Sequence, residues 1–133
     1  MSDATPVRTT SRILIVDDSS EASAILAIAL GTIHDAAIQV ADSAESALDR
    51  LIQQPVDVLV TDVRMSGMSG LDLLKTAREN GRWPACGAVV ISGETGPDLR
   101  QRAFESGAAA FFTKPFSAGE VRRVVISLLE SRS

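Results

Sequence analysis

The chain has 133 residues, enough for one domain with a substantial core but short of two ordinary domains. Apolar residues make up 45% and charged residues 23%, which excludes a disordered or fibrous chain. A net charge of −4 argues against direct nucleic acid binding, and the single cysteine excludes an internal disulfide. Because no apolar run reaches the roughly 18–20 residues that cross a bilayer, we expect a cytoplasmic protein with no membrane partner.

Short apolar runs, rich in branched or aromatic residues, predict five strands buried on both faces of a parallel sheet. These runs cover residues 12–16, 37–40, 56–61, 88–92 and 109–113. Amphipathic patterns between the runs predict helices at 20–30, 43–53, 70–80, 97–106 and from Ser117 onward. We expect residues 1–11 to be a flexible N-terminal tail, residues 12–130 to form the domain, and residues 131–133 to form a C-terminal tail.

The alternation of strands and helices predicts a (βα)5 chain, whose right-handed crossovers place helices on both faces of one sheet. The fold class is therefore α/β, a doubly wound, flavodoxin-like parallel sheet with strand order 2-1-3-4-5. Such sheets bind ligands at the carboxyl ends of their strands, next to the point where the strand order reverses. The candidate site thus consists of the residues that follow each apolar run.

Polar residues end or directly follow four of the five predicted strands, with strand two as the exception: Asp17 with Asp18, then Asp62, Ser92 and Lys114. Three carboxylates within about 4–6 Å repel one another, so such a cluster either raises a pKa or binds a hard divalent cation. Mg²⁺ fits best, because it takes one or two carboxylates together with phosphate oxygens. Asp62 would then be the nucleophile for a phosphoryl group, whose charge Lys114 and Mg²⁺ offset and whose oxygens Ser92 hydrogen-bonds.

Each of these residues alone has an ordinary structural explanation. A single Asp at a strand end is most often a helix N-cap, a lone Lys is most often solvated, and Ser92 precedes a glycine as turn residues do. The prediction depends on their conjunction at one edge of one sheet.

Four segments resemble the receiver domains of bacterial two-component response regulators: ILIVDDSS (13–20), VDVLVTDVRMSGMSGLDLL (56–74), VVISG (89–93) and GAAAFFTKPF (107–116). The spacings agree as well, with 44 residues from Asp18 to Asp62, 30 from Asp62 to Ser92 and 52 from Asp62 to Lys114. The resemblance covers residues 12–129 and implies that 12–130 is a receiver domain.

The resemblance implies that Asp62 is the phosphoacceptor for a sensor histidine kinase or a histidine phosphotransfer protein. It implies that Asp18 and Asp62 bind Mg²⁺ directly, that Asp17 acts through water, and that the backbone carbonyl of Arg64 completes the protein ligands. Lys114 would pair with the phosphoryl group. The only reactions implied are self-phosphorylation and autodephosphorylation, with no independent enzymatic turnover.

The resemblance also implies a switch, in which Ser92 supplies the hydroxyl and Phe111 the aromatic side chain. Together they would remodel the surface of helix four, strand five and helix five for a downstream protein target. A cis bond is implied before Pro115, and Gly93 would leave room for the phosphodonor. The chain departs from the family at Ser66, where proline is usual, so the geometry of that loop is open.

Several alternatives stay open from the sequence. The Met1 start and the short segment after Leu129 favour a stand-alone single-domain regulator, against a receiver fragment of a larger regulator or hybrid histidine kinase. A degenerate receiver that serves only as a scaffold is disfavoured because acceptor and lysine are both present. A haloacid-dehalogenase-type phosphohydrolase would need a D-x-D pattern after strand one, whereas Asp17 and Asp18 are adjacent. Dimerisation is left open.

Overall fold

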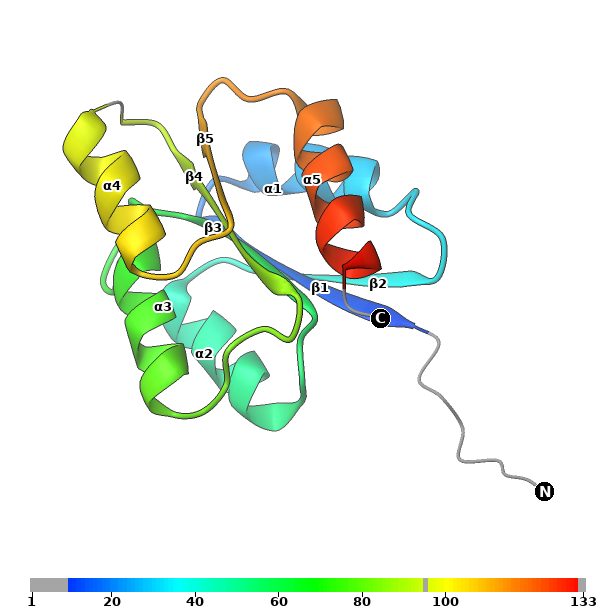
Figure 1. The fold of residues 1–133 in the computed structure, drawn as a ribbon, viewed down its shortest axis with the longest axis horizontal. Helices are drawn as coiled ribbons and strands as arrows, with labels where there is room; N and C mark the ends of the chain where they lie inside the picture. The colour runs from blue at the N-terminus through cyan, green and yellow to red at the C-terminus, as the bar shows by residue number, and fades with distance from the viewer. Residues whose placement is uncertain (1–9, 95, 132–133) are drawn as a thin grey trace.

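The computed structural model describes residues 10–94 and 96–131. Within them the elements are, in chain order, β1 (Ser11–Val16), α1 (Ser20–Leu30), β2 (Ala36–Ala41), α2 (Ala44–Gln53), β3 (Val58–Asp62), α3 (Gly70–Glu79), β4 (Gly87–Ser92), α4 (Pro97–Glu105), β5 (Ala110–Thr113) and α5 (Ala118–Glu130). The strands pair in parallel in the order β2-β1-β3-β4-β5 (Figure 1). The predicted doubly wound, flavodoxin-like fold is confirmed.

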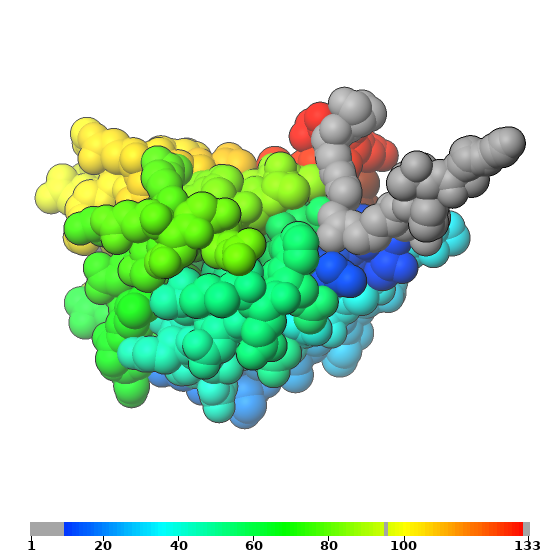
Figure 2. All heavy atoms as spheres, turned by 90° about the horizontal axis from the view of Figure 1, so that it is seen from below, coloured from blue at the N-terminus to red at the C-terminus, as the bar shows by residue number. Residues whose placement is uncertain are grey.

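Strand β1, which lies between β2 and β3, contributes to two cores because successive side chains point to opposite faces of the sheet. Leu14 and Val16 pack with buried residues of α2, α3 and α4, whereas Ile13 and Ile15 pack with α1 and α5. Figure 1 shows the same division, with α1 and α5 on one face and the other three helices opposite. The space-filling view from below presents the surface that α2 and α3 form (Figure 2).

Serine side chains cap four of the five described helices. The hydroxyls of Ser19, Ser43, Ser69 and Ser117 each accept a hydrogen bond from a backbone N–H of the first turn. Helix α4 differs, since it begins with proline after Gly96 and has no side-chain cap. Only Ala103 of α4 is buried, so this helix has less apolar contact with the sheet than its neighbours.

The structure corrects several predicted boundaries. Ser11 is part of β1, and its amide donates to the carbonyl of Asp35 over 2.7 Å, so the predicted tail does not reach this residue. Residues 1–9 of that tail, and 132–133 at the other end, lie outside the described residues. Strand β3 begins at Val58, two residues later than predicted, and β2 extends to Ala41. None of the helices in the described ranges is long and apolar enough to span a membrane.

Candidate functional site

Three carboxylates meet at the carboxyl edge of the sheet. Asp17 and Asp18 directly follow β1, and Asp62 is the last residue of the neighbouring β3. One oxygen from each lies within 4.8 Å of the others. The side chains of Asp17 and Asp62 are 3% and 6% exposed, whereas Asp18 is exposed, so the cluster opens to solvent on the Asp18 side.

Lys114 brings a positive charge to the two buried carboxylates from the end of β5. Its Nζ donates to Asp17 Oδ2 over 3.0 Å and to Asp62 Oδ2 over 3.3 Å. The Lys114 amide donates to the carbonyl of Ser92 over 2.8 Å, which fixes the backbone next to β4. The bond between Lys114 and Pro115 is cis, in agreement with what the resemblance implies.

The backbone around Asp62 holds its carboxylate in place. Oδ1 accepts a hydrogen bond from the amide of Val63 over 2.9 Å, and Oδ2 faces Lys114. Gly70, the first residue of α3, lies against the Asp62 carbonyl oxygen so closely that a Cβ at this position would overlap it. Only glycine therefore permits this approach of α3 to the acceptor strand.

Burial and charge alter two pKa values at the site. Desolvation by burial, followed by repulsion from Asp17, raises the pKa of the Asp62 carboxyl, although Lys114 acts in the opposite direction. For Lys114, burial favours a lower pKa, but hydrogen bonds and attraction from Asp17 and Asp62 outweigh it and raise the pKa. Lys114 is therefore a stable cation beside a carboxyl group whose negative charge is costly.

The donor set suits a hard divalent cation. All three converging groups are carboxylates, the oxygen ligands that Mg²⁺ prefers. Asp17 already accepts hydrogen bonds from the Ser19 amide over 2.8 Å and from Lys114, which leaves Asp18 as the carboxylate most open to a metal. The residues present fit Mg²⁺, and the ligand role of the Arg64 carbonyl stays a prediction.

The predicted switch residues lie on the two strands that follow β3 in the sheet, Ser92 on β4 and Phe111 on β5. Ser92 ends β4 fully buried, and its Oγ accepts a hydrogen bond from the Glu94 amide over 3.0 Å. A Cβ at Gly93 would meet only Lys114 Cδ, at 3.9 Å, so this side of the site is uncrowded. Phe111 is half-buried in β5 and lines a hollow of about 440 Å³ with residues of α4. Coupling between Ser92 and Phe111 stays a prediction.

The sequence reasoning missed two acidic residues near the site. Asp42 directly follows β2 and lines a hollow of about 460 Å³ with Asp17 and Asp18. The predicted strand ends at residue 40, whereas β2 ends at Ala41, and with the observed end the rule on strand ends includes Asp42. Glu94 was missed as well; it lies two residues after Ser92, and its carboxylate is 2.6 Å from Arg64, which lies two residues after Asp62.

A further acidic side chain holds the loop in which Ser66 replaces the usual proline. Glu45 of α2 accepts a hydrogen bond from the Met68 amide over 3.1 Å. Gly67 has a φ of +81° and lies against the same carboxylate, a conformation that favours glycine. The loop therefore has a defined path without a proline.

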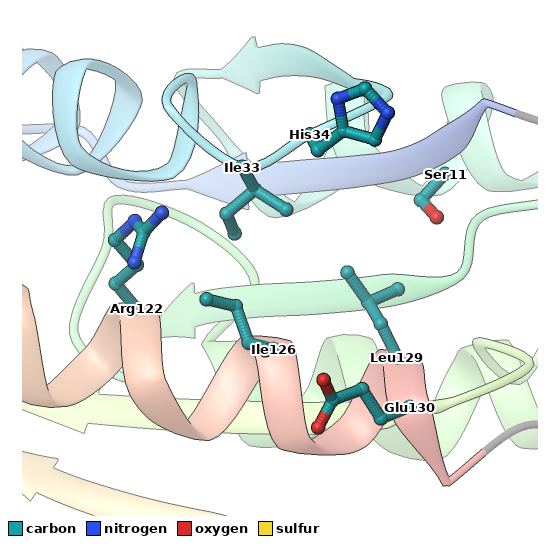
Figure 3. A pocket seen from close by; sticks show the side chains of 7 residues that line it. All are labelled: Ser11, Ile33, His34, Arg122, Ile126, Leu129 and Glu130. Atoms are coloured by element: carbon teal, nitrogen blue, oxygen red, sulfur yellow. The ribbon is translucent and has the colours of Figure 1, made fainter.

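A separate hollow lies at the opposite end of the sheet. Its volume is about 370 Å³, and Ile33, Ile126 and Leu129 line it together with polar groups that include His34 and Arg122 (Figure 3). Ser11, the first residue of β1, also lines this hollow, whereas Asp17 and Asp18 of the acidic site follow the last residue of that strand. This hollow is therefore separate from the acidic site.

Comparison with known proteins identifies relatives of this chain. A family model described as the response regulator receiver domain matches residues 13–126. A two-component response regulator of Oryza sativa subsp. indica is 33% identical over 120 residues, which cover 88% of this chain and 80% of that protein. The sensor histidine kinase TmoS of Ectopseudomonas mendocina is 31% identical over 91% of this chain but only 12% of its own length.

Solved structures show the same fold. A receiver protein from Pseudomonas putida is 30% identical with a TM-score of 0.82, covering 91% of this chain and 99% of that one. The receiver domain of the Francisella response regulator 1452 has a TM-score of 0.85 at 22% identity, covering 93% and 100%. The latter likeness shows the fold alone.

Proposed function

Because this chain belongs to the response regulator receiver domain family of two-component systems, we propose that Asp62 accepts a phosphoryl group from a partner's phosphohistidine. The supporting observation is the position of the Asp62 carboxylate, which lies 3.3 Å from Lys114 and within 4.8 Å of two further carboxylates. In this step an Asp62 oxygen attacks phosphorus, the histidine nitrogen–phosphorus bond breaks, and the imidazole departs with the electron pair of that bond.

The charges of the site support this assignment. Mg²⁺ held by Asp18 and Asp62 would offset the negative charge of the phosphoryl oxygens. Before transfer, the formal charges of the three carboxylates, Lys114 and Mg²⁺ sum to zero. Transfer then adds about one negative charge. Lys114 already lies between Asp17 and Asp62, and it would donate to the incoming phosphoryl oxygens.

The response would pass through Ser92 and Phe111 to the surface of α4, β5 and α5, where a downstream protein binds. The Ser92 hydroxyl is fully buried, and it must leave the Glu94 amide in order to turn toward a phosphoryl group. The hollow beside Phe111 gives this ring space to move. The thin apolar contact of α4 also favours its displacement.

The test is incubation of the purified protein with Mg²⁺ and a small acyl phosphate, followed by intact-mass measurement. Wild type should gain one phosphoryl group, and Asp62→Asn should gain none. Asp49→Asn, which changes an exposed Asp on α2, is the matched control and should behave as wild type. Absence of the mass gain in wild type, under conditions where an established receiver domain is labelled, would refute the proposal.

A further inference from the structure

The hollow at the end of the sheet opposite the acidic site has an aliphatic lining. Its volume of about 370 Å³ falls within the range of about 300–1,000 Å³ that is typical of small-molecule sites. Ile126 and Leu129 come from α5, Ile33 comes from the α1–β2 loop, and Ser11 of β1 completes the lining on one side. Figure 3 shows Arg122, Ile126 and Leu129 pointing from α5 toward Ile33. The apolar part of a ligand would contact aliphatic carbon here instead of water.

Arg122, Ile126 and Leu129 form a line along α5. They are separated by four and then three residues, the spacing that places side chains on one face of a helix. At about 1.5 Å per residue, the distance along the helix axis from Arg122 to Leu129 is roughly 10 Å. The hollow therefore has a cation at one end and aliphatic side chains over the rest of that length.

The guanidinium of Arg122, which is half-buried, is oriented by Thr32. Its Nε donates to Thr32 Oγ1 over 2.7 Å, and the same hydroxyl donates to the carbonyl of Ala29 over 2.7 Å. Among residues 10–94 and 96–131, no carboxylate forms an ion pair with Arg122. Its two Nη groups can therefore bind a carboxylate ligand through two parallel hydrogen bonds.

Glu130 gives the other end of the hollow the opposite charge. It follows Leu129 directly, lines the same hollow and is exposed. Glu130 repels an anionic group at this end, whereas Arg122 attracts one at the other. His34 is 95% exposed and lies 3.1 Å from Asp35, so Arg122 is the cation that a bound anion would meet. An anionic ligand thus has one favoured orientation, with its head at Arg122 and its apolar part over the aliphatic lining.

The next residue along α5 is also an arginine, and it differs from Arg122 in its surroundings. Arg123 is 75% exposed, and its Nη1 lies 2.8 Å from a carboxylate oxygen of Glu120. It does not line the hollow. The charge of Arg123 is therefore already paired and in contact with water, which makes this residue a matched control for Arg122.

We propose that this hollow binds a small aliphatic carboxylate of about eight carbon atoms, with its carboxylate on Arg122 and its chain over Ile126 and Leu129. Such a chain is roughly 9 Å long when extended, from carbon–carbon bonds of about 1.5 Å at near-tetrahedral angles, and matches the length of the lining. Arg122 binds the ligand, and Thr32 is a positioning residue that acts through Arg122. The inference does not depend on phosphorylation of Asp62.

The experiment titrates octanoate, hexanoate, butanoate and 1-hexanol into the ¹⁵N-labelled, metal-free full chain and follows the backbone amide signals by NMR. Octanoate should cause saturable shifts centred on Ile33, Arg122, Ile126 and Leu129, with a Kd on the order of 1 mM. Butanoate should bind about tenfold or more weakly, because it has four fewer methylene groups to bury. 1-Hexanol should bind about threefold or more weakly than hexanoate, because it lacks the carboxylate.

Three variants test the role of the guanidinium. Arg122→Gln should weaken octanoate binding by about fivefold or more and remove the advantage of hexanoate over 1-hexanol. Thr32→Val keeps Arg122 but removes the hydroxyl that orients it, so octanoate binding should weaken by about twofold or more. Arg123→Gln should match wild type with every ligand.

Lys114 is the competing cation for a carboxylate, since it lines a hollow of about 260 Å³ with Phe116. Saturable shifts at the α5 hollow, with the expected order of ligands and weaker binding in Arg122→Gln and Thr32→Val, support the inference. Shifts centred on Lys114 and Phe116, or the absence of saturation, overturn it. Equal affinity for hexanoate and 1-hexanol, or unchanged affinity in either site variant, overturns it as well.

Discussion

The ammonium group of Lys114 lies closer to Asp17, at 3.0 Å, than to the proposed acceptor Asp62, at 3.3 Å. In the unphosphorylated protein Lys114 therefore offsets the charge of both buried carboxylates, and it is not reserved for Asp62. Both buried carboxylates thus have a cationic partner before a metal or a phosphoryl group binds. It also gives Lys114 a measurable structural role that is separate from any role in phosphorylation.

Lys114→Met should lower the free energy of unfolding of the metal-free protein by about 1–3 kcal/mol, because two buried carboxylates lose their cationic partner. Urea denaturation with and without Mg²⁺ measures this, and Mg²⁺ should restore more stability to the variant than it adds to wild type. The chain has one other lysine, Lys75, which is exposed on α3. Lys75→Met should leave stability within about 0.5 kcal/mol of wild type.

The raised pKa of Asp62 predicts a dependence of stability on pH. In the metal-free protein the folded state holds the Asp62 proton to a higher pH than the unfolded chain, whose carboxyl has the ordinary value of 3.8. The contribution of Asp62 to stability therefore falls as pH rises from that value through the folded-state pKa. Asp62→Asn removes this loss and should raise the melting temperature at pH 7 by about 2–5 °C.

The control for this measurement is Asp49→Asn, which removes one negative charge from an exposed position. Thermal melts should show the gain from Asp62→Asn shrinking as pH falls toward 3.8 and disappearing below it, where both states of wild type are protonated. An equal gain at every pH, or an equal gain from Asp49→Asn, would contradict the assignment of the effect to the Asp62 charge.

Gly70→Ala should destabilise the protein by about 1–3 kcal/mol, because the new Cβ overlaps the Asp62 carbonyl oxygen and α3 must move away from β3. Gly119→Ala on α5 is the matched control, since its Cβ would meet nothing nearer than Ser117 Oγ at 3.8 Å. This control should be neutral or stabilising by about 0.5 kcal/mol. Chemical denaturation distinguishes the two, and equal effects would refute the close approach.

Arg78, near the end of α3, contacts both the Trp83 ring and the C-cap residue of α4. Its guanidinium carbon lies 4.4 Å from the centre of the indole ring, and Nη2 donates to the carbonyl of Ser106 over 3.1 Å. Arg78→Met should lower stability by about 0.5–1 kcal/mol and shift the emission of Trp83, the only tryptophan in the chain, to longer wavelength. Arg100→Met, which removes a cation from Phe104, should leave that emission unchanged.

The alternation of strand and helix patterns was sufficient to predict the fold and most of the candidate site. Asp17, Asp18, Asp62, Ser92 and Lys114 all follow apolar runs, and parallel pairing must bring such positions to one edge. Helix α1 has the bounds that its pattern predicts, Ser20–Leu30. A polar residue at the end of a strand adds nothing to the apolar pattern, so the pattern places Ser11 in the tail although it pairs with Ala36 of β2.

Contacts across loops needed the tertiary structure. No spacing rule indicates that Arg64 meets Glu94 or that Glu45 supports Met68, because the conformation of each loop depends on the helices packed around it.

The sequence by itself determined which residues lie at the carboxyl edge, since side-chain periodicity and the handedness of crossovers are local properties of an L-amino acid chain. Only the tertiary structure decided which of these residues contact one another. Lys114 lies nearer Asp17 than Asp62, and Gly70 touches the Asp62 carbonyl oxygen. Such contacts depend on differences of less than about an ångström in interatomic distance, which are fixed only when all the helices and strands pack together.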